Sequence, residues 1–411
     1  MPLRTAEQAR ASAMLVQRFA RNRQCFPASE RPLDRAAGIF RRAENRQVFE
    51  ILTHTGLPAL RAALDAEFKE WKNGKVTPDS RLDPRMPVRL ADGILGSLEV
   101  LAVYGQADDL PRIVDAARAR VLAGDDRWTA VLGGLGRHAE TARVALDALA
   151  EPLPEGALGV AVLGLANRLC RENRVARHPF DSQAGRERLG AYLRAAEPTN
   201  SSVPIAAAAA LPFISKRDAL LKLADSHPAP RVQLEAAWAR AFLGQADGFA
   251  RLARQARDPL QAQVAISYLR ELGREDLLPK SASDPSFAAQ AELAAWLARP
   301  SEFGRAPDKL IEVEQRELAW PTGGWKQLRL YRYLYHPEGD NPLVDGFAVL
   351  GLNRIFSMKA TRGVLDVQPS EIYASACCWD LQQSGDPRAE GCDVQRGLEL
   401  LGLKAKPRAT P

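Results

Sequence analysis

A short phrase that recurs along the chain constrains its fold more than any other feature. Residues 104–108 read YGQAD, residues 243–247 read LGQAD and residues 272–276 read LGRED. Each copy ends one Ala/Leu-rich amphipathic segment and precedes a second one. A single pair of such helices cannot bury its apolar face, whereas stacked neighbouring pairs can. The phrase therefore predicts an array of stacked helix pairs.

Prolines mark the beginning of the clearest pairs. Pro204, Pro230, Pro259 and Pro285 each open an Ala/Leu-rich segment, at spacings of 26, 29 and 26 residues. Proline suits the first turn of a helix because its missing N–H would have no intrahelical partner there. The glycine of each phrase can take the left-handed conformation that ends a helix. We expect the aspartate that follows it to cap the second helix of the pair.

Segments 230–258 and 259–278 resemble HEAT repeats of the short class that is also called phycobilisome-lyase-like. Residues 98–110 (LEVLAVYGQADDL) match the same habit of an Ala/Leu helix, a glycine, an aspartate and a second helix. The resemblance extends over residues 91–300 and is closest at 200–298. It implies an α-solenoid that acts as a binding scaffold. It does not imply a lyase, because the chain shows no motif for attaching a bilin.

The same patterns predict a domain organisation. Residues 1–75 form a basic helical region, and residues 76–90, which are polar and contain three prolines, form a linker. HEAT-like repeats occupy residues 91–303, a small α+β domain follows at 304–403, and 404–411 form a disordered tail. The predicted fold class is mainly α, an α-solenoid followed by a domain with an antiparallel sheet. Besides the segments opened by the four prolines, helices are expected at residues 5–22, 33–55, 57–73, 91–104, 109–122, 126–137, 139–150, 157–172, 216–226 and 246–256.

The C-terminal region changes from helical to strand periodicity. Residues 309–318 and 327–335 alternate in polarity on either side of a WPTGG turn, which predicts a hairpin. Residues 347–352 predict a third, more buried strand, so we expect a three-stranded antiparallel sheet. A helix is expected to begin within 353–358, and another to cover 369–383.

The second predicted strand carries a row of tyrosines. Alternation places Tyr331, Tyr333 and Tyr335 on one face of this strand and its leucines on the other. Because tyrosine is enriched at protein interfaces, this row and the neighbouring Trp325 form our candidate partner-binding site. The alternative is that the tyrosines pack under the C-terminal helix that carries Tyr373.

Positive charge is concentrated near the N-terminus. The chain has a net charge of +6, and residues 1–50 contain ten arginines against five acidic residues. Such a region could bind nucleic acid, an anionic membrane or an acidic protein. Arginines that line one surface with aromatic residues between them would favour nucleic acid, whereas pairing with Glu44 and Glu50 would favour a protein scaffold. The arginines in question are Arg18, Arg21, Arg23, Arg41, Arg42 and Arg46.

The cysteines and histidines are the candidates for chemistry. The five cysteines are odd in number and irregularly spaced, so we expect neither a disulfide framework nor a metal site. Cys377 and Cys378 are expected to pack as small apolar residues, with a redox or metal role as the alternative. His336 lies near Glu338 and Asp340, which is typical of a solvated turn and, alternatively, of an acid–base site.

No catalytic, cofactor-binding or metal-binding motif is recognisable in the chain. No stretch approaches the roughly 20 apolar residues of a membrane span, no secretory signal is evident, and we expect a reducing cytoplasm. The sequence therefore predicts a non-enzymatic protein–protein interaction scaffold that binds another protein. The alternatives are a nucleic-acid-binding protein that uses the basic N-terminal helices, and an enzyme centred on the C-terminal domain.

Overall fold

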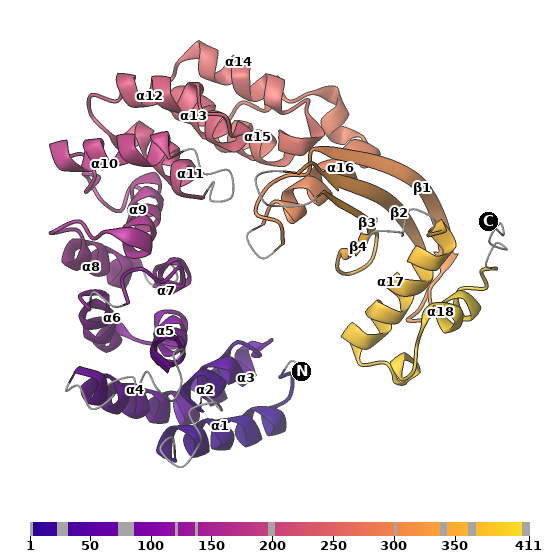
Figure 1. Ribbon diagram of the computed structural model, residues 1–411, viewed down its shortest axis with the longest axis horizontal. Helices are drawn as coiled ribbons and strands as arrows, with labels where there is room; N and C mark the ends of the chain where they lie inside the picture. Colours follow the sequence, from indigo (N-terminus) through magenta and orange to yellow (C-terminus); the bar gives the residue numbers. More distant parts are fainter. Residues whose placement is uncertain are drawn as a thin grey trace. The chain divides into compact units, whose positions relative to one another are not determined.

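A computed structural model of the protein describes residues 3–22, 32–72, 86–119, 122–135, 139–195, 202–299, 302–337, 343–360 and 367–404. Within these residues the fold is mainly helical and contains a C-terminal antiparallel sheet, which confirms the predicted fold class (Figure 1). The chain divides into two compact units. Unit 1 comprises Met1–Arg194 and Ala206–Leu220, and unit 2 comprises Ala195–Ile205 and Leu221–Pro411. The division falls inside the predicted repeat segment, so a continuous solenoid stays a prediction.

Helices of unit 1 stack in two rows. Helices α2, α5, α7 and α9 contact one another in chain order, and α6 contacts α8 in a second row. Stacked helix pairs produce this pattern, because each first helix packs between its neighbours. The helices are α1 (Ala6–Arg21), α2 (Pro32–Phe40), α3 (Arg46–Ile51), η3 (Leu52–Gly56), α4 (Leu57–Lys72), α5 (Met86–Tyr104), η4 (Ala107–Asp109), α6 (Leu110–Ala117), α7 (Trp128–Gly134), α8 (Ala139–Leu149), α9 (Gly156–Arg171) and α10 (Gln183–Arg194).

Unit 2 continues the pairs that the prolines predicted. Pro230, Pro259 and Pro285 are the first residues of α13 (Pro230–Phe242), α15 (Pro259–Glu271) and α16 (Pro285–Leu297), as expected. Helix α13 contacts both α14 (Ala246–Gln255) and α15, and α15 contacts α16. The helices α11 (Ser202–Ala209) and α12 (Asp218–Asp225) span the division between the units.

The glycines of the recurring phrase act in two ways. Gly244 and Gly273 have φ values of +77° and +66°, which confirms the predicted left-handed helix ends. Gly105 is needed for close approach instead. A Cβ on Gly105 would lie 2.3 Å from the carbonyl oxygen of Leu101 and 2.5 Å from Oδ2 of Asp109.

The aspartate of the phrase does not cap the second helix, so that prediction was wrong. The N-cap of α14 is Gln245, which has an extended backbone, and Asp247 lies inside the first turn of the helix. Asp108 likewise follows the N-cap Gln106 of η4. A carboxylate at this place still complements the positive end of the helix dipole.

Several boundaries differ from the predicted ones. The expected helix at 33–55 is split, because the side chain of Asn45 accepts a hydrogen bond of 2.9 Å from the N–H of Val48 and begins α3. Helix α10 was not predicted. Residues 73–85 and 405–411, which include most of the expected linker and tail, lie outside the described residues. Helix α5 begins at Met86, so the end of the expected linker is helical.

The C-terminal sheet has four strands rather than three. The strands β1 (Lys309–Ala319), β2 (Trp325–Tyr335), β3 (Val344–Leu350) and β4 (Phe356–Ala360) follow in that order and pair antiparallel. Strand β4 replaces the helix expected within 353–358. Gly351 makes the turn into β4 with a φ of +99°, and Phe356 then pairs with Val349 and is buried beside it.

Helices of unit 2 cover both faces of this sheet. Strand residues such as Leu328 and Leu330 pack with Tyr373 of α17 (Pro369–Ser384), and Leu401, which follows α18 (Val394–Leu400), completes this cluster. On the opposite face the strand tyrosines pack with Leu293 and Leu297 of α16. The last helix of the predicted repeats is therefore also a layer of the α+β region.

A bulge in β1 distributes two carboxylates between the faces. The register shifts between Glu312, which lies opposite Tyr331, and Glu314, which lies opposite Leu330. Since residues directly opposite each other share a face, Glu312 points to the α16 side and Glu314 to the α17 side. The bulged residue, Val313, is 41% exposed on this edge strand.

Candidate interaction surfaces

The tyrosine row is buried, so the prediction that it forms an exposed recognition surface was wrong. Tyr331, Tyr333 and Tyr335 are inaccessible to solvent, or nearly so, beneath α16. The alternative, that the tyrosines pack inside the fold, was correct. The helix it named was wrong, because α17 covers the leucine face of the strand and not the tyrosine face. Trp325, at the beginning of the same strand, is 71% exposed and is the one predicted partner-binding residue that solvent reaches.

Hydrogen bonds fix the three buried hydroxyls inside the fold. Tyr333 donates to the carbonyl oxygen of Met358 at 3.2 Å, and Tyr335 donates to that of Arg305 at 3.0 Å. Tyr331 donates to Oε2 of Glu312 at 3.2 Å. Burial raises the pKa of Tyr331 and of Tyr333 to about 12. These groups therefore stay protonated and serve the packing of the sheet.

Two of the six arginines proposed for nucleic acid are paired within the chain. Arg46 Nε lies 2.8 Å from Oε1 of Glu50, and Arg41 Nη2 lies 2.7 Å from Oε2 of Glu99. Glu44 is paired as well, with Arg4 at 2.7 Å. Of these pairs, only Arg46–Glu50 is one that we expected to favour a protein scaffold, because Arg41 pairs with Glu99 and Glu44 pairs with Arg4, which is not among the six. Arg23 lies outside the described residues.

Helix α1 has an inner face that packs against the fold and an outer face that is exposed to solvent. The side chains of its inner face are small and apolar, and its start is capped by Thr5, whose hydroxyl oxygen accepts a hydrogen bond from the N–H of Gln8. At 100° per residue, the opposite face combines guanidinium groups with two exposed apolar side chains, Met14 at 62% and Leu15 at 45% exposure. The cations of this outer face are Arg10, Arg18 and Arg21, all exposed.

A groove runs beside this outer face, between α1 and α4. It has a volume of about 450 Å³, and most of its lining side chains are small. Gln17 donates to the carbonyl oxygen of Thr55 at 3.1 Å and ties the two sides together. The lining residues are Gln17, Ala20, Arg21, Thr55, Pro58, Ala59, Ala62 and Ala63. Sequence periodicity could not find this groove, because it depends on how closely the alanines of two helices approach.

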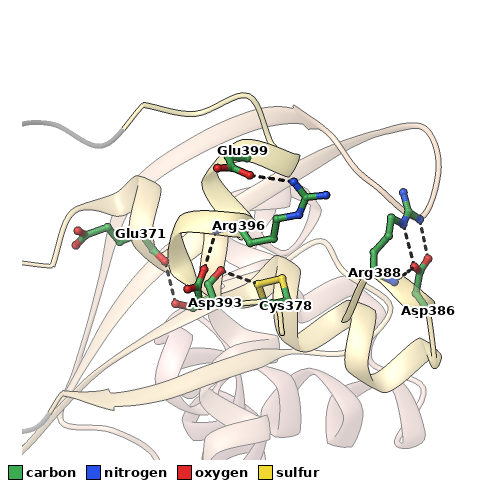
Figure 2. The surroundings of a disulfide bond; sticks show 9 residues. Glu371, Cys378, Asp386, Arg388, Asp393, Arg396 and Glu399 are labelled. Carbon is green, nitrogen blue, oxygen red and sulfur yellow. Dashed lines mark hydrogen bonds and ion pairs between the residues drawn. A yellow bond between two sulfur atoms is a disulfide. The ribbon is translucent and has the colours of Figure 1, made fainter. Parts of the chain in front are cut away.

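Two of the cysteines form a disulfide, which corrects the prediction of no disulfide. Cys378 on α17 is bonded to Cys392 before α18, with their Cα atoms 5.5 Å apart (Figure 2). That separation is typical of disulfides. Cys377 is free and buried as predicted, and burial together with the charge of Asp380 raises the pKa of its thiol to about 11. Disulfides are rare in a reducing cytoplasm, so the predicted compartment stays a prediction.

Loss of this disulfide is expected to lower the free energy of unfolding by about 3 kcal/mol, because it closes a loop with a sequence separation of 14. The measurement is urea denaturation of the wild type and of a Cys378→Ser/Cys392→Ser variant, each with and without reductant. Reductant should affect only the wild type. Equal stability of all four samples, or five free thiols in the unreduced denatured chain, would contradict the assignment.

His178 is a buried neutral histidine that holds the segment before α10. Its Nδ1 accepts a hydrogen bond of 3.2 Å from the N–H of Phe180, so the proton resides on Nε2, 2.9 Å from Oδ1 of Asn167. Burial lowers the pKa of His178 to about 4.

The predicted acid–base candidate, His336, is exposed instead. His336 is 70% exposed, with Nδ1 3.6 Å from Oδ2 of Asp308, and Glu338 and Asp340 lie outside the described residues.

Acidification should destabilise the fold through His178. Its pKa is near 6.5 in the unfolded chain and about 4 when folded. The unfolded state therefore takes up the proton first as the pH falls below 6.5. Linkage predicts that this group lowers the free energy of unfolding by about 2 kcal/mol between pH 7 and pH 5. A His178→Gln variant should lack this component in urea titrations, whereas His336→Gln should keep it. Identical pH profiles for wild type and His178→Gln would refute it.

The remaining observations assign no further site. Among the residues with described positions, no cluster of histidine, cysteine, aspartate and glutamate is suited to hold a metal ion. Over the same residues, no helix has both the length and the apolar character of a bilayer span. Comparison of the chain with protein-family models, with curated proteins and with solved structures gave no match.

Proposed function

We propose that this protein is a non-enzymatic protein–protein interaction scaffold built from HEAT-like helix pairs. The observation that carries the proposal is the outer face of α1, where Met14 and Leu15 are adjacent and exposed on a folded helix. The two side chains point about 100° apart on the helix, each beside exposed arginines, and methionine and arginine are both enriched at protein interfaces. Helix pairs that stack in rows suit such a role because they present extended surfaces.

The pairing of arginines supports a protein partner over nucleic acid. Binding to phosphates depends on cations that can exchange counterions for phosphate oxygens. Arg41 and Arg46 are engaged by carboxylates of their own chain, so each would first have to leave Glu99 or Glu50. The remaining exposed cations of α1 stand beside apolar side chains, which contribute nothing to contacts with phosphate.

The test is affinity capture from a native lysate with the tagged full chain, in the presence and absence of nuclease. We expect protein partners that survive nuclease and are lost from a Met14→Ser/Leu15→Ser variant. The control is Val144→Ser, which changes an apolar residue on α8 that is as exposed as Leu15. Recovery of nucleic acid alone, with a steep dependence on salt, would replace this proposal with the nucleic-acid alternative.

A further inference from the structure

We propose that the α1–α4 groove and the outer face of α1 form one docking site for an acidic amphipathic helix of a partner protein. This inference rests on the proposed function and specifies where and what the scaffold binds. The apolar side chains of the partner helix would enter the groove and lie against Met14, which at 100° per residue is on the groove side of the outer face. Its carboxylates would meet the arginines of α1.

The groove is suited to apolar side chains of moderate size. Its volume of about 450 Å³ lies within the range of about 300–1,000 Å³ that is typical of binding pockets. Ala20 and Ala63 are buried and leave the space open, because neither has atoms beyond Cβ. Ala59 and Ala62 extend this alanine-lined surface along α4, and Pro58 also lines it. Helices that dock in grooves use a row of apolar anchors in this way.

The charges beside the groove select an acidic partner. Arg10, Arg18 and Arg21 lie on the outer face, with Glu7 as the one acidic residue among them, so the face carries a net charge of +2. Arg21 is also part of the groove lining. Among the described residues, no carboxylate forms an ion pair with these three guanidinium groups, in contrast to Arg41 and Arg46.

The spacing of the arginines matches a helix. From Arg10 to Arg21 the rise is about 17 Å at 1.5 Å per residue, which is about three turns. A partner helix that lies alongside can place a carboxylate opposite each arginine while its apolar face points into the groove. Complementary charges of this kind steer association and fix the register of docking.

A membrane surface fits these observations less well. A helix that lies in a membrane interface needs a broad apolar face directed outward. Helix α1 directs its apolar stripe inward, where Ala9, Ala13, Val16 and Ala20 are buried, and exposes only Met14 and Leu15 as large apolar residues. This leaves too little apolar area for insertion, whereas Met14 alone is enough for the edge of a helix–helix contact beside the groove.

The experiment measures the binding of a fluorescent 18-residue helical peptide with leucines on one face and glutamates beside them. Fluorescence anisotropy with the full chain should show saturable binding. The Arg18→Glu/Arg21→Glu variant should bind the peptide at least tenfold more weakly than the wild type. The matched control is Arg254→Glu/Arg257→Glu, which makes the same charge change at the same spacing near the end of α14, at exposed positions. It should stay within twofold of the wild type.

A second variant tests the groove separately from the charge. Ala59→Phe should fill the groove and weaken the peptide at least fivefold, while circular dichroism and thermal unfolding stay as in the wild type. Equal binding of a peptide with lysines in place of the glutamates would overturn the proposal. So would tighter binding to phosphatidylglycerol vesicles or to a 20-base-pair DNA. Captured protein partners that persist in Arg18→Glu/Arg21→Glu would overturn this site and leave the scaffold function standing.

Discussion

Replacing Tyr333 with alanine is expected to lower the free energy of unfolding by about 3–5 kcal/mol, the cost of removing a large aromatic side chain from a packed core. Tyr333 is fully buried, and its ring meets Phe303 edge-on with centroids 5.5 Å apart. The ring also lies across Gly346, its partner on β3, where a Cβ would come within 2.3 Å of Cζ of Tyr333. Because Gly346 has no side chain of its own, removing the ring leaves a space above this glycine.

Trp325→Ala is the control for this measurement, because it removes an aromatic side chain from the same strand at an exposed position. It should change the stability by less than about 0.5 kcal/mol. Chemical denaturation of both variants, followed by far-ultraviolet circular dichroism, decides the matter. Equal effects of the two substitutions would mean that α16 does not cover the tyrosine face. If Tyr333→Ala loses both stability and partner binding, the loss of binding reflects unfolding and not a contact made by Tyr333.

The tyrosine row shows where sequence reasoning succeeds and where it stops. Alternation along residues 325–335 placed the leucines and tyrosines on opposite faces, and the structure has them so. Alternation gives no information on which helix covers which face. The helix over the tyrosines, α16, ends at Leu297, well before Tyr331 in the chain, and has the proline start and Ala/Leu composition of a repeat helix. Its second role depends on tertiary packing alone.

Local signals predicted helix starts better than they predicted strands and pairings. The prolines at 230, 259 and 285 each begin a helix, because a fixed φ and a missing N–H act within one turn. Strand β4 was missed because its residues gain their strand conformation from pairing with β3. The disulfide was missed for a similar reason, since Cys378 and Cys392 are brought together by the turn between α17 and α18.

The candidate docking site was also predictable only in part. The excess of arginine near the N-terminus was visible in the sequence, but the division into paired and free groups was not. Arg41 meets Glu99 across a separation of 58 residues, whereas Arg18 has no such neighbour among the described residues. The groove beside α1 depends on the packing of α1 against α4, which no periodicity specifies.

Replacing Asp109 with alanine is expected to cost about 3 kcal/mol of stability, because the carboxylate is only 2% exposed and joins three parts of unit 1. It accepts two hydrogen bonds from Arg61 of α4, at 2.7 and 2.6 Å, and one of 3.2 Å from Arg112 of α6. It also accepts the N–H of Gln106 at 2.9 Å, which closes the turn after α5. Removing it leaves two half-buried guanidinium groups and one N–H without that partner.

The neighbouring Asp108 provides the matched control, because it is exposed and carries the same charge one residue earlier. Asp108→Ala should change the free energy of unfolding by less than about 0.5 kcal/mol. The double variant Arg61→Met/Asp109→Leu adds a second comparison. Replacing both partners with apolar groups should cost less than Asp109→Ala alone, since a buried pair owes much of its apparent value to the charge that a single deletion leaves behind. A double variant that is less stable than Asp109→Ala would instead show that the pair itself stabilises the junction of α4 with α5 and α6.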